Sequence, residues 1–304
     1  MKILLTGSGG FLGKNVKPIL SEGHEVVGVR SANWDLRKQN TCEQLVKMTR
    51  PDVVVHAAGS VGGIGANQEN PGKFLYENLI MGANLIEAAR VNEISKFVLL
   101  GTVCAYPKWT PVPFKEEEIW NGYPEETNAP YGIAKKALMK MLETYKEQYG
   151  FNGVNLIPVN MYGPHDHFNL TSSHVIPALI LKVYNAMKAC ERSITLWGTG
   201  TVSREFLYAA DCGDAIKTAI EKDVPPEPIN IGTGKEITIS ALAEEIAEQM
   251  GFDGEILYDS SKPDGQPRRC LDTQKAKDLL GFEAKTDLTS GLKNTIEWFL
   301  KREE

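Results

Sequence analysis

The sequence predicts an α/β fold, a doubly wound parallel sheet with helices on both faces and a smaller C-terminal lobe. Three observations indicate this fold. Short apolar runs alternate with amphipathic stretches through the first half of the chain. A glycine-rich turn directly follows the first run, as in sheets that bind ligands at the carboxyl ends of their strands. After residue 160 the alternation becomes irregular and loops with proline appear, so we expect the second lobe there.

Each predicted element follows from its pattern. Runs that are short and apolar throughout predict buried parallel strands at 2–7, 25–29, 52–56, 96–101 and 153–159. The stretches between them predict helices at 11–21, 40–49, 71–91 and 130–149. After residue 160 we expect an apolar helix near 174–187, strands near 194–197 and 228–231, and a helix at 287–301.

Composition argues against several functional classes. The chain has 304 residues, a formal net charge of −6 and five cysteines. An acidic chain does not favour nucleic-acid binding, which depends on clustered Lys and Arg. No segment approaches the roughly 20 apolar residues that span a bilayer, and the first residues do not resemble a signal peptide. The cysteines are widely spaced without a CxxC pair, so we expect no disulfide framework, no metal site and a cytoplasmic location.

A glycine-rich turn follows the first predicted strand. Gly7, Gly10 and Gly13 have the spacing GxxGxxG and open a predicted helix, with Phe11 and Leu12 between the last two. Glycine lets the backbone turn sharply and approach a pyrophosphate, and the helix N-terminus supplies free N–H groups and positive potential. Glycine clusters also make ordinary turns, but this position in a strand–helix unit favours a dinucleotide site and a Rossmann-like sheet.

The end of the second predicted strand indicates which dinucleotide binds. An acidic residue there would bind a ribose 2′-hydroxyl, whereas an arginine accommodates a 2′-phosphate. Arg30 stands at this position, so NADP(H) is favoured and NAD(H) stays possible. Arg30 could instead be a solvated surface cation, and Asp35 could contact the adenine or ribose.

A tyrosine and a lysine four residues apart form the candidate chemical centre. Tyr131 and Lys135 would share one face of a helix that has Asn128 as its N-cap. A cation beside the phenol would stabilise its ionised form and lower its pKa from about 10, so that Tyr131 could act as an acid near neutrality.

The same spacing occurs twice more in the chain, so the spacing alone has little value. Tyr184 with Lys188 and Tyr258 with Lys262 repeat it. Only the pair at Tyr131 has a hydroxyl upstream, Thr102, where the fourth predicted strand ends and a cofactor-facing loop is expected.

The Ser/Thr, Tyr and Lys arrangement resembles that of the short-chain dehydrogenases/reductases, and nearly the whole chain is similar to their extended GDP-L-fucose synthase family. The similar segments are HAAGSVGGIGAN (56–67), GTVCAYPK (101–108), NAPYGIAK (128–135), PVNMYGPHDHF (158–168), SSHVIPAL (172–179), WGTGTVSREFLY (197–208) and KPDGQPRR (262–269). The resemblance implies an enzyme that epimerises two carbons beside the ketone of GDP-4-keto-6-deoxy-D-mannose and reduces the ketone with NADPH, giving GDP-L-fucose.

The resemblance also implies catalytic roles. Inversion beside a carbonyl needs protons removed and returned on opposite faces of the sugar, hence acid–base groups besides the tyrosine. Cys104 matches the family's base and His174 its partner acid. In an extended segment Cys104 would point to the same side as Thr102. Without the resemblance, Cys104 would be a small buried hydrophobe and His174 a structural histidine. In the reduction Tyr131 would protonate the keto oxygen, Thr102 would hydrogen-bond to it, and Lys135 would hold the ribose.

Further ligand contacts are implied by the same segments. Those to the cofactor are Asn160 and His174, and those to the nucleotide sugar are Lys182, Trp197, Arg204 and Asp264. We expect Lys182 and Arg204 toward the pyrophosphate or ribose and Trp197 near the base. Alternatively, Arg204 could pair with Glu205, Trp197 could fill a core, and Lys182 could be solvated.

Two departures from the family pattern affect these expectations. The family usually has Ser where this chain has Thr102, and the added methyl could alter the fit of the sugar. Relatives carry an extra Arg in the cofactor loop where this chain has Ser8 and Gly9, which leaves phosphate recognition to Arg30 and the backbone.

The resemblance finally implies how the chain is divided into domains and how it assembles. We expect a dinucleotide-binding domain at 1–158, to which 205–233 return, a nucleotide-sugar-binding lobe at 159–204 and 234–304, and a homodimer packed through 71–91 and 130–149. Two alternatives stay open: a reductase or epimerase of a related GDP-4-keto-6-deoxy hexose or heptose, and a dinucleotide-binding sensor without catalysis.

Overall fold

The computed structural model describes residues 1–170, 172–262 and 264–303. Its main sheet has six strands, all paired in parallel, in the order β2-β1-β3-β4-β5-β9. They are β1 Lys2–Thr6, β2 Glu25–Val29, β3 Val53–His56, β4 Lys96–Leu100, β5 Gly153–Pro158 and β9 Pro228–Ile231. The predicted doubly wound parallel sheet is therefore confirmed. The strand order reverses between β1 and β3, where sheets of this kind bind ligands beyond the carboxyl ends.

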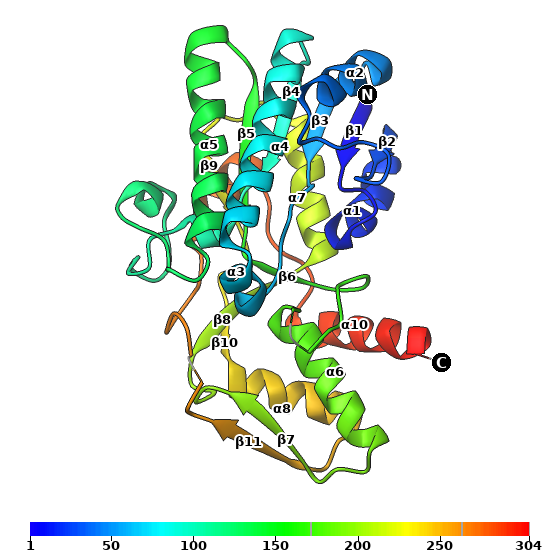
Figure 1. Cartoon of the computed structure of the whole chain (residues 1–304), viewed down its shortest axis with the longest axis vertical. Coiled ribbons are helices and arrows are strands. Elements are labelled where there is room, and N and C mark those ends of the chain that lie inside the picture. Colours follow the sequence, from blue (N-terminus) through cyan, green and yellow to red (C-terminus); the bar gives the residue numbers. More distant parts are fainter. Residues whose placement is uncertain (171, 263, 304) are drawn as a thin grey trace.

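Helices cover both faces of this sheet (Figure 1). On one face lie α2 Gln39–Thr49, α4 Pro71–Val91 and α5 Ala129–Tyr149, and on the other α1 Phe11–Ser21, α7 Ala209–Glu221 and α9 Gln274–Leu280. Because both faces are covered, the strands bury nearly continuous apolar runs, as Leu4, Leu5, Val54 and Val55 illustrate. The sequence did not predict α7, whose buried positions are mostly small residues rather than a long apolar stripe.

The smaller lobe lies below the carboxyl ends of the main sheet in Figure 1. It contains a three-stranded sheet of β10 Glu236–Thr238, β8 Ser203–Tyr208 and β6 Asn160–Tyr162, and a two-stranded sheet of β11 Glu255–Asp259 and β7 Ser193–Trp197. Its helices are α6 Val175–Lys188, α8 Ile239–Met250 and α10 Leu288–Glu303, and α3 Ile64–Glu69 borders it.

Two separate clusters of buried apolar side chains fill the two parts. The predicted helices near 174–187 and 287–301 and the strand near 194–197 are confirmed in the lower part, whereas the strand at 228–231 is β9 of the main sheet. Within the described ranges, each helix is too short or too polar to cross a lipid bilayer.

Candidate active site

One cleft of about 1420 Å³ lies between the carboxyl ends of the main sheet and the smaller lobe. A site for a single small ligand is typically about 300–1,000 Å³, so this cleft has room for two ligands. Every residue that the sequence assigned to a site lines it. They are Gly7, Gly10, Phe11, Leu12, Gly13, Arg30, Thr102, Cys104, Tyr131, Lys135, Asn160, His174, Lys182, Trp197, Arg204 and Asp264. Neither of the other two Tyr–Lys pairs is among the described residues that line the cleft.

The glycine-rich turn forms one end of the cleft. Gly7 has a φ of +70°, and a Cβ there would lie 2.8 Å from the Ala58 backbone. A Cβ on Gly13 would overlap the Gly7 carbonyl oxygen. The turn therefore packs directly against the loop after β3, and only glycine permits it. No side chain caps α1, so its first N–H groups are available to an anion, as a dinucleotide pyrophosphate requires.

Arg30 lies across the same turn. A Cβ on Gly9 would be 2.8 Å from Cδ and Nε of Arg30, so the glycine makes room for this side chain. No ion pair or hydrogen bond of the Arg30 side chain is present among the described residues. Asp35, by contrast, accepts a hydrogen bond from Arg37 Nε at 2.8 Å, which lowers its pKa. Its carboxylate is thus engaged, and Arg30 is the free charged group at this end of the cleft.

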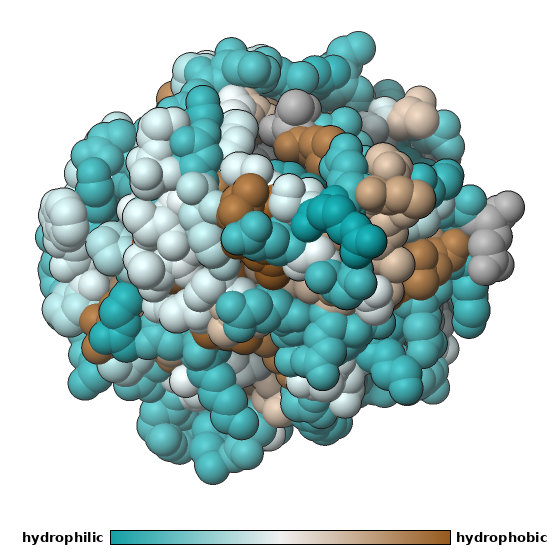
Figure 2. Space-filling model, turned by 90° about the horizontal axis from the view of Figure 1, so that it is seen from below, coloured by the Kyte–Doolittle hydropathy of each residue, from teal (hydrophilic) through white to brown (hydrophobic). Residues whose placement is uncertain are grey.

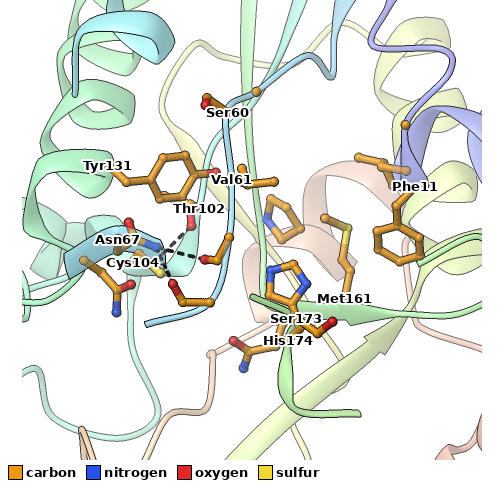
Figure 3. Close-up of a pocket in the computed structure, with 18 of the residues that line it drawn as sticks. Phe11, Ser60, Val61, Asn67, Thr102, Cys104, Tyr131, Met161, Ser173 and His174 are labelled. Atoms are coloured by element: carbon orange, nitrogen blue, oxygen red, sulfur yellow. Dashed lines mark hydrogen bonds between the residues drawn. The ribbon is translucent and has the colours of Figure 1, made fainter. Parts of the chain in front are cut away.

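Thr102 and Cys104 stand on a tight turn rather than on an extended segment. Val103–Ala105 form a 3₁₀ helix, and the Thr102 hydroxyl caps it by accepting a hydrogen bond from the Cys104 N–H at 3.2 Å. The expected extended conformation is therefore wrong, because the hydroxyl satisfies the first free N–H of the turn. Both side chains nevertheless line the cleft, together with Tyr131 (Figure 3).

Tyr131 is half-buried and adjoins the Thr102 hydroxyl. Burial raises the pKa of the phenol, so Tyr131 stays protonated at neutral pH. Lys135 is only 3% exposed and donates from Nζ to the Leu100 carbonyl oxygen at 2.9 Å. Burial lowers the pKa of Lys135 to about 8. The expected lowering of the phenol pKa by Lys135 is thus wrong, because burial of the phenol dominates. A protonated phenol is the form that can donate a proton.

The start of α5 also differs from the expectation in one detail. Asn128 precedes the helix, but its side chain makes no capping bond and instead donates from Nδ2 to Glu125 Oε2 at 3.2 Å. Pro130 lies in the first turn, where its missing N–H costs nothing. The helix therefore begins where the sequence predicted, without the predicted side-chain cap.

His174 precedes α6 and is exposed to the cleft. Figure 3 shows it displaced from Thr102, Cys104 and Tyr131 toward Met161 and Phe11. Its Nδ1 lies 3.7 Å from Oδ1 of Asp166.

Asp166 is buried, and its Oδ2 has no hydrogen-bond partner among the described residues. His165 and His167 have other partners: the ring of His165 makes an edge-to-face contact with Trp298, and Nε2 of His167 lies 3.2 Å from Ser172 Oγ. Of these three histidines, only His174 lines the cleft.

Two cations that the sequence assigned to the smaller lobe, Lys182 and Arg204, line the cleft. Lys182 Nζ donates to the Thr195 carbonyl oxygen at 2.5 Å, and Arg204 Nη1 donates to the Ser203 carbonyl oxygen at 2.7 Å. Burial and the nearby charge of Arg269 lower the pKa of Arg204 to about 10. Arg204 does not pair with Glu205, whose carboxylate accepts backbone N–H groups instead. Lys182 and Arg204 thus retain unpaired charge in the cleft among the described residues.

Trp197 and Asp264 shape the far end of the cleft. Trp197 is 66% exposed, so it does not fill a core. The Asp264 carboxylate accepts hydrogen bonds from the Thr199 N–H at 2.7 Å and from its hydroxyl at 3.0 Å. Asp264 was predicted to face the ligand; it lines the cleft, but its carboxylate holds the turn that follows Trp197.

Sequence reasoning missed three residues of the cleft. Arg269 Nη1 lies 3.8 Å from Cys104 Sγ, and Gln266 accepts hydrogen bonds from the same guanidinium. Asn67 donates to the Gly62 carbonyl oxygen at 2.8 Å and also bonds Gly63, holding a glycine-rich loop along the cleft (Figure 3). All three stand in segments that the sequence analysis singled out, but only the fold shows which side chains of these segments point inward.

Comparisons with known proteins agree with this geometry. The family model described as NAD dependent epimerase/dehydratase family matches residues 3–232. A GDP-L-fucose synthase of Sinorhizobium fredii is 40% identical over 300 residues, covering 98% of this chain and 95% of that protein. A GDP-L-colitose synthase of Yersinia pseudotuberculosis is 39% identical over 303 residues, covering 99% and 98%.

Solved structures are similar over the same span. A GDP-6-OMe-4-keto-L-xylo-heptose reductase from C. jejuni superimposes with a TM-score of 0.92 at 27% identity, covering 99% of this chain and 98% of that one. A GDP-L-fucose synthetase from Naegleria fowleri bound to NADP has a TM-score of 0.90 at 28% identity, covering 99% and 94%.

Proposed function

The chain belongs to the NAD dependent epimerase/dehydratase family, and from this premise we propose that it converts GDP-4-keto-6-deoxy-D-mannose to GDP-L-fucose. The reaction would invert the two carbons beside the ketone and then reduce the ketone. One observation carries the proposal: Thr102, Cys104, Tyr131 and His174 line a single cleft that also contains the glycine-rich turn. Relatives named GDP-L-fucose synthase, matched over nearly their full length, support the same substrate.

NADP(H) is the proposed cofactor, with NAD(H) as the alternative. The glycine-rich turn and the N-terminus of α1 would hold the pyrophosphate, and Arg30, which has no described partner, would meet the 2′-phosphate. Lys135, Asn160 and His174 line the adjoining part of the cleft. When bound, the reduced cofactor supplies the hydride that reduces the ketone. An NADP-bound structure of a similar protein supports this choice.

In the reduction Tyr131 would act as the proton donor. Its phenol is protonated at neutral pH and half-buried, and the Thr102 hydroxyl adjoins it. The two hydroxyls would both hydrogen-bond the keto oxygen, and Tyr131 would transfer its proton as charge develops there. The buried ammonium of Lys135 would hold the cofactor ribose beside this pair.

In the epimerisation Cys104 would act as base and His174 as acid. A ketone acidifies the neighbouring C–H bonds, because the electron pair left behind moves onto the keto oxygen as an enolate. Tyr131 and Thr102 would donate hydrogen bonds to that oxygen. The Cys104 thiolate would remove the proton from one face of the sugar, and the His174 imidazolium would return one to the other face. The Asp166 carboxylate would orient the imidazole.

The smaller lobe would bind the nucleotide part of the substrate. Lys182 and Arg204 would meet the pyrophosphate or ribose, because their charges are unpaired among the described residues, and the exposed ring of Trp197 would contact the base. We propose the same division of the chain as before, 1–158 with 205–233 for the dinucleotide and 159–204 with 234–304 for the nucleotide sugar. The two apolar clusters support most of it, but Leu271, Ala276 and Leu280 pack in the cluster of the main sheet and Phe206 in that of the smaller lobe.

We also propose a cytoplasmic homodimer packed through α4 and α5. Leu75, Tyr76 and Leu79 on α4 and Tyr149 at the end of α5 are large apolar or aromatic side chains left exposed. The face seen from below is mostly hydrophilic or neutral, with hydrophobic residues at a few places (Figure 2). Light scattering should give twice the chain mass, and Tyr76→Glu with Leu79→Glu should halve it; a monomeric parent protein would refute the dimer.

Product analysis in deuterated water tests the proposed activity. The purified protein with GDP-4-keto-6-deoxy-D-mannose and NADPH should yield GDP-L-fucose carrying solvent deuterium at both inverted carbons. Reduction without deuterium incorporation, giving a rhamnose-type product, would overturn the epimerase part. Cys104→Ser should impair deuterium incorporation more than hydride transfer, and an unchanged product ratio and rate would remove Cys104 as base.

A second candidate is a reductase or epimerase of a related GDP-4-keto-6-deoxy hexose or heptose. The methyl of Thr102, next to the proposed sugar position, and the similarity to a protein named as a GDP-heptose reductase favour it. The same assay with hexose and heptose substrates in parallel discriminates the two by their kcat/KM. A dinucleotide-binding sensor is disfavoured, because Tyr131 and Lys135 are both present and both line the cleft.

A further inference from the structure

The cleft holds a buried cation to which the proposed reaction assigns no role. Arg269 is 8% exposed, and its Nη1 lies 3.8 Å from the Cys104 sulfur. This sulfur is the single hydrogen-bond acceptor of Nη1 among the described residues. The guanidinium is therefore directed at the thiol.

The orientation of the Arg269 side chain is fixed by Gln266. Nε and Nη2 of Arg269 donate to Gln266 Oε1 at 3.2 and 3.1 Å, so one amide oxygen accepts hydrogen bonds from two of the three guanidinium nitrogens. Gln266 is itself 6% exposed and donates from Nε2 to the Lys108 carbonyl oxygen at 2.7 Å. The Gln266 amide cannot rotate without losing its hydrogen bonds to Arg269 and to Lys108, so Nη1 of Arg269 stays directed at the Cys104 sulfur.

The backbone of Arg269 is anchored independently. The Ser203 N–H donates to the Pro267 carbonyl oxygen at 3.0 Å, and the Glu205 N–H donates to the Arg269 carbonyl oxygen at 3.0 Å. The Leu271 N–H donates to the Glu205 carboxylate at 2.6 Å. This segment thus runs beside β8 in a fixed register, which places Arg269 opposite the turn that bears Cys104.

The charge of Arg269 is not matched by an acid. Within the described ranges no carboxylate forms an ion pair with it, and the half-buried Arg204 is close enough for the two positive charges to repel each other. Its neighbour Arg268 differs in burial and in pairing, because it is exposed and forms an ion pair with Glu236. A buried, unpaired cation is costly unless a negative group meets it, and the Cys104 thiol, which its Nη1 contacts at 3.8 Å, is a group able to become negative.

We propose that Arg269, held by Gln266, is a positioning residue that stabilises the thiolate form of Cys104 and so equips this cysteine to remove a proton from the substrate. The inference rests on the proposed function. In the step it supports, a C–H bond beside the ketone breaks, an S–H bond forms, and the electron pair moves to the keto oxygen as an enolate. The guanidinium exchanges no atom or electron in this step.

Thiol alkylation of the free, full-length protein tests the inference without substrate. The rate at which iodoacetamide modifies each cysteine is followed by mass spectrometry of peptides at near-neutral pH. Burial raises the pKa of Cys42, Cys212 and Cys270 to about 12, so these thiols should stay unmodified. Cys190 is exposed and serves as the internal reference. Arg269→Gln should slow the modification of Cys104 by about tenfold, because only the thiolate reacts, and should leave Cys190 unchanged.

Matched variants separate charge from structure. Arg269→Lys should restore most of the Cys104 rate, because it keeps the positive charge, and Arg268→Gln should leave the rate unchanged. An unchanged Cys104 rate in Arg269→Gln overturns the proposal, as does a loss that Lys does not rescue. If Arg269→Gln does not fold, Gln266→Met is used in its place. This variant keeps the Arg269 guanidinium but removes the amide that fixes its orientation, and it should slow the modification of Cys104 by about threefold. An unchanged rate in that variant overturns the proposal equally.

The outcome is distinguishable from a failure of the proposed function. If the parent enzyme incorporates no solvent deuterium into the sugar, the epimerase activity fails, whatever the alkylation rates. If deuterium enters normally but Arg269→Gln leaves alkylation of Cys104 unchanged, only the role of Arg269 fails.

Discussion

Glu205 should be the most costly single polar residue to replace. Its side chain is fully buried, and its carboxylate accepts hydrogen bonds from the backbone N–H groups of Thr233, Gly234 and Leu271. These bonds join β8 of the smaller lobe to the loop after β9 of the main sheet and to the segment that carries Arg269. Replacing Glu205 therefore loosens the connection between the two parts of the cleft.

The expected loss follows from the three donors. Glu205→Ala leaves three buried N–H groups without partners, each costing about 1–3 kcal/mol. Removing the buried carboxylate also removes an unfavourable contribution, because burial raises the pKa of Glu205 and disfavours its charged form. This gain offsets part of the loss. Taking the lower value for each donor, we expect a loss of about 3 kcal/mol in the free energy of unfolding. Glu205→Gln keeps one acceptor oxygen and should lose about 1–2 kcal/mol.

The contribution of Glu205 to the free energy of unfolding depends on pH. The folded-state pKa of Glu205 is raised above its unfolded value of 4.5, so this carboxyl contributes most stability below that pH and loses it as pH rises through the folded-state pKa. The difference between the parent protein and Glu205→Gln should thus be larger at acid pH than at neutral pH.

Urea unfolding measures these losses. The exposed Glu255→Ala serves as the control and should stay within about 0.5 kcal/mol of the parent. A loss below about 1 kcal/mol in Glu205→Ala, or equal losses in the Ala and Gln variants, would refute the assignment of three backbone bonds to this carboxylate.

Three further predictions concern the cleft. Tyr131→Phe should slow reduction by at least about 10²-fold while NADPH binding is retained, because only the proton donor is lost; unchanged single-turnover reduction would remove Tyr131 from this role. Arg30→Gln should lower the preference for NADPH over NADH by about tenfold, read from the ratio of kcat/KM values, and an unaltered ratio would assign phosphate recognition elsewhere. Because burial lowers the pKa of Lys135 to about 8, its ammonium is lost above that pH. NADPH affinity measured by fluorescence should fall as pH rises through this value, whereas Lys135→Met should bind weakly without this pH dependence; a parent affinity independent of pH would contradict the role.

Most of the main sheet could be predicted because its strands are buried on both faces. Such strands appear in the sequence as short, continuous apolar runs, and the β4 run Lys96–Leu100 is one example. The smaller lobe was harder to predict. β10 has only three residues, and β11 is largely exposed, so neither carries a distinct apolar pattern.

The candidate site, too, was predicted only in part from the sequence. The motifs identified Tyr131, Cys104 and His174, which share no sequence neighbourhood, and the fold brings them to one cleft. Side-chain conformation and pKa were predicted less well. The sequence could not show that Cys104 stands on a 3₁₀ turn, or that burial would outweigh the charge of Lys135 in setting the pKa of Tyr131.

By itself the sequence determined the doubly wound sheet and the glycine-rich turn, because strand burial and backbone close approach are local properties of residue type. The proposed acid–base groups Cys104 and His174 came from the resemblance of their motifs to a known family. Only the tertiary structure decided which charges meet in the cleft. Arg268 and Arg269 are identical in type and adjacent in the chain, yet one is exposed beside Glu236 and the other is buried against Cys104. The pairing of the segment 267–271 with β8 makes this choice, since alternate residues of an extended segment face opposite sides.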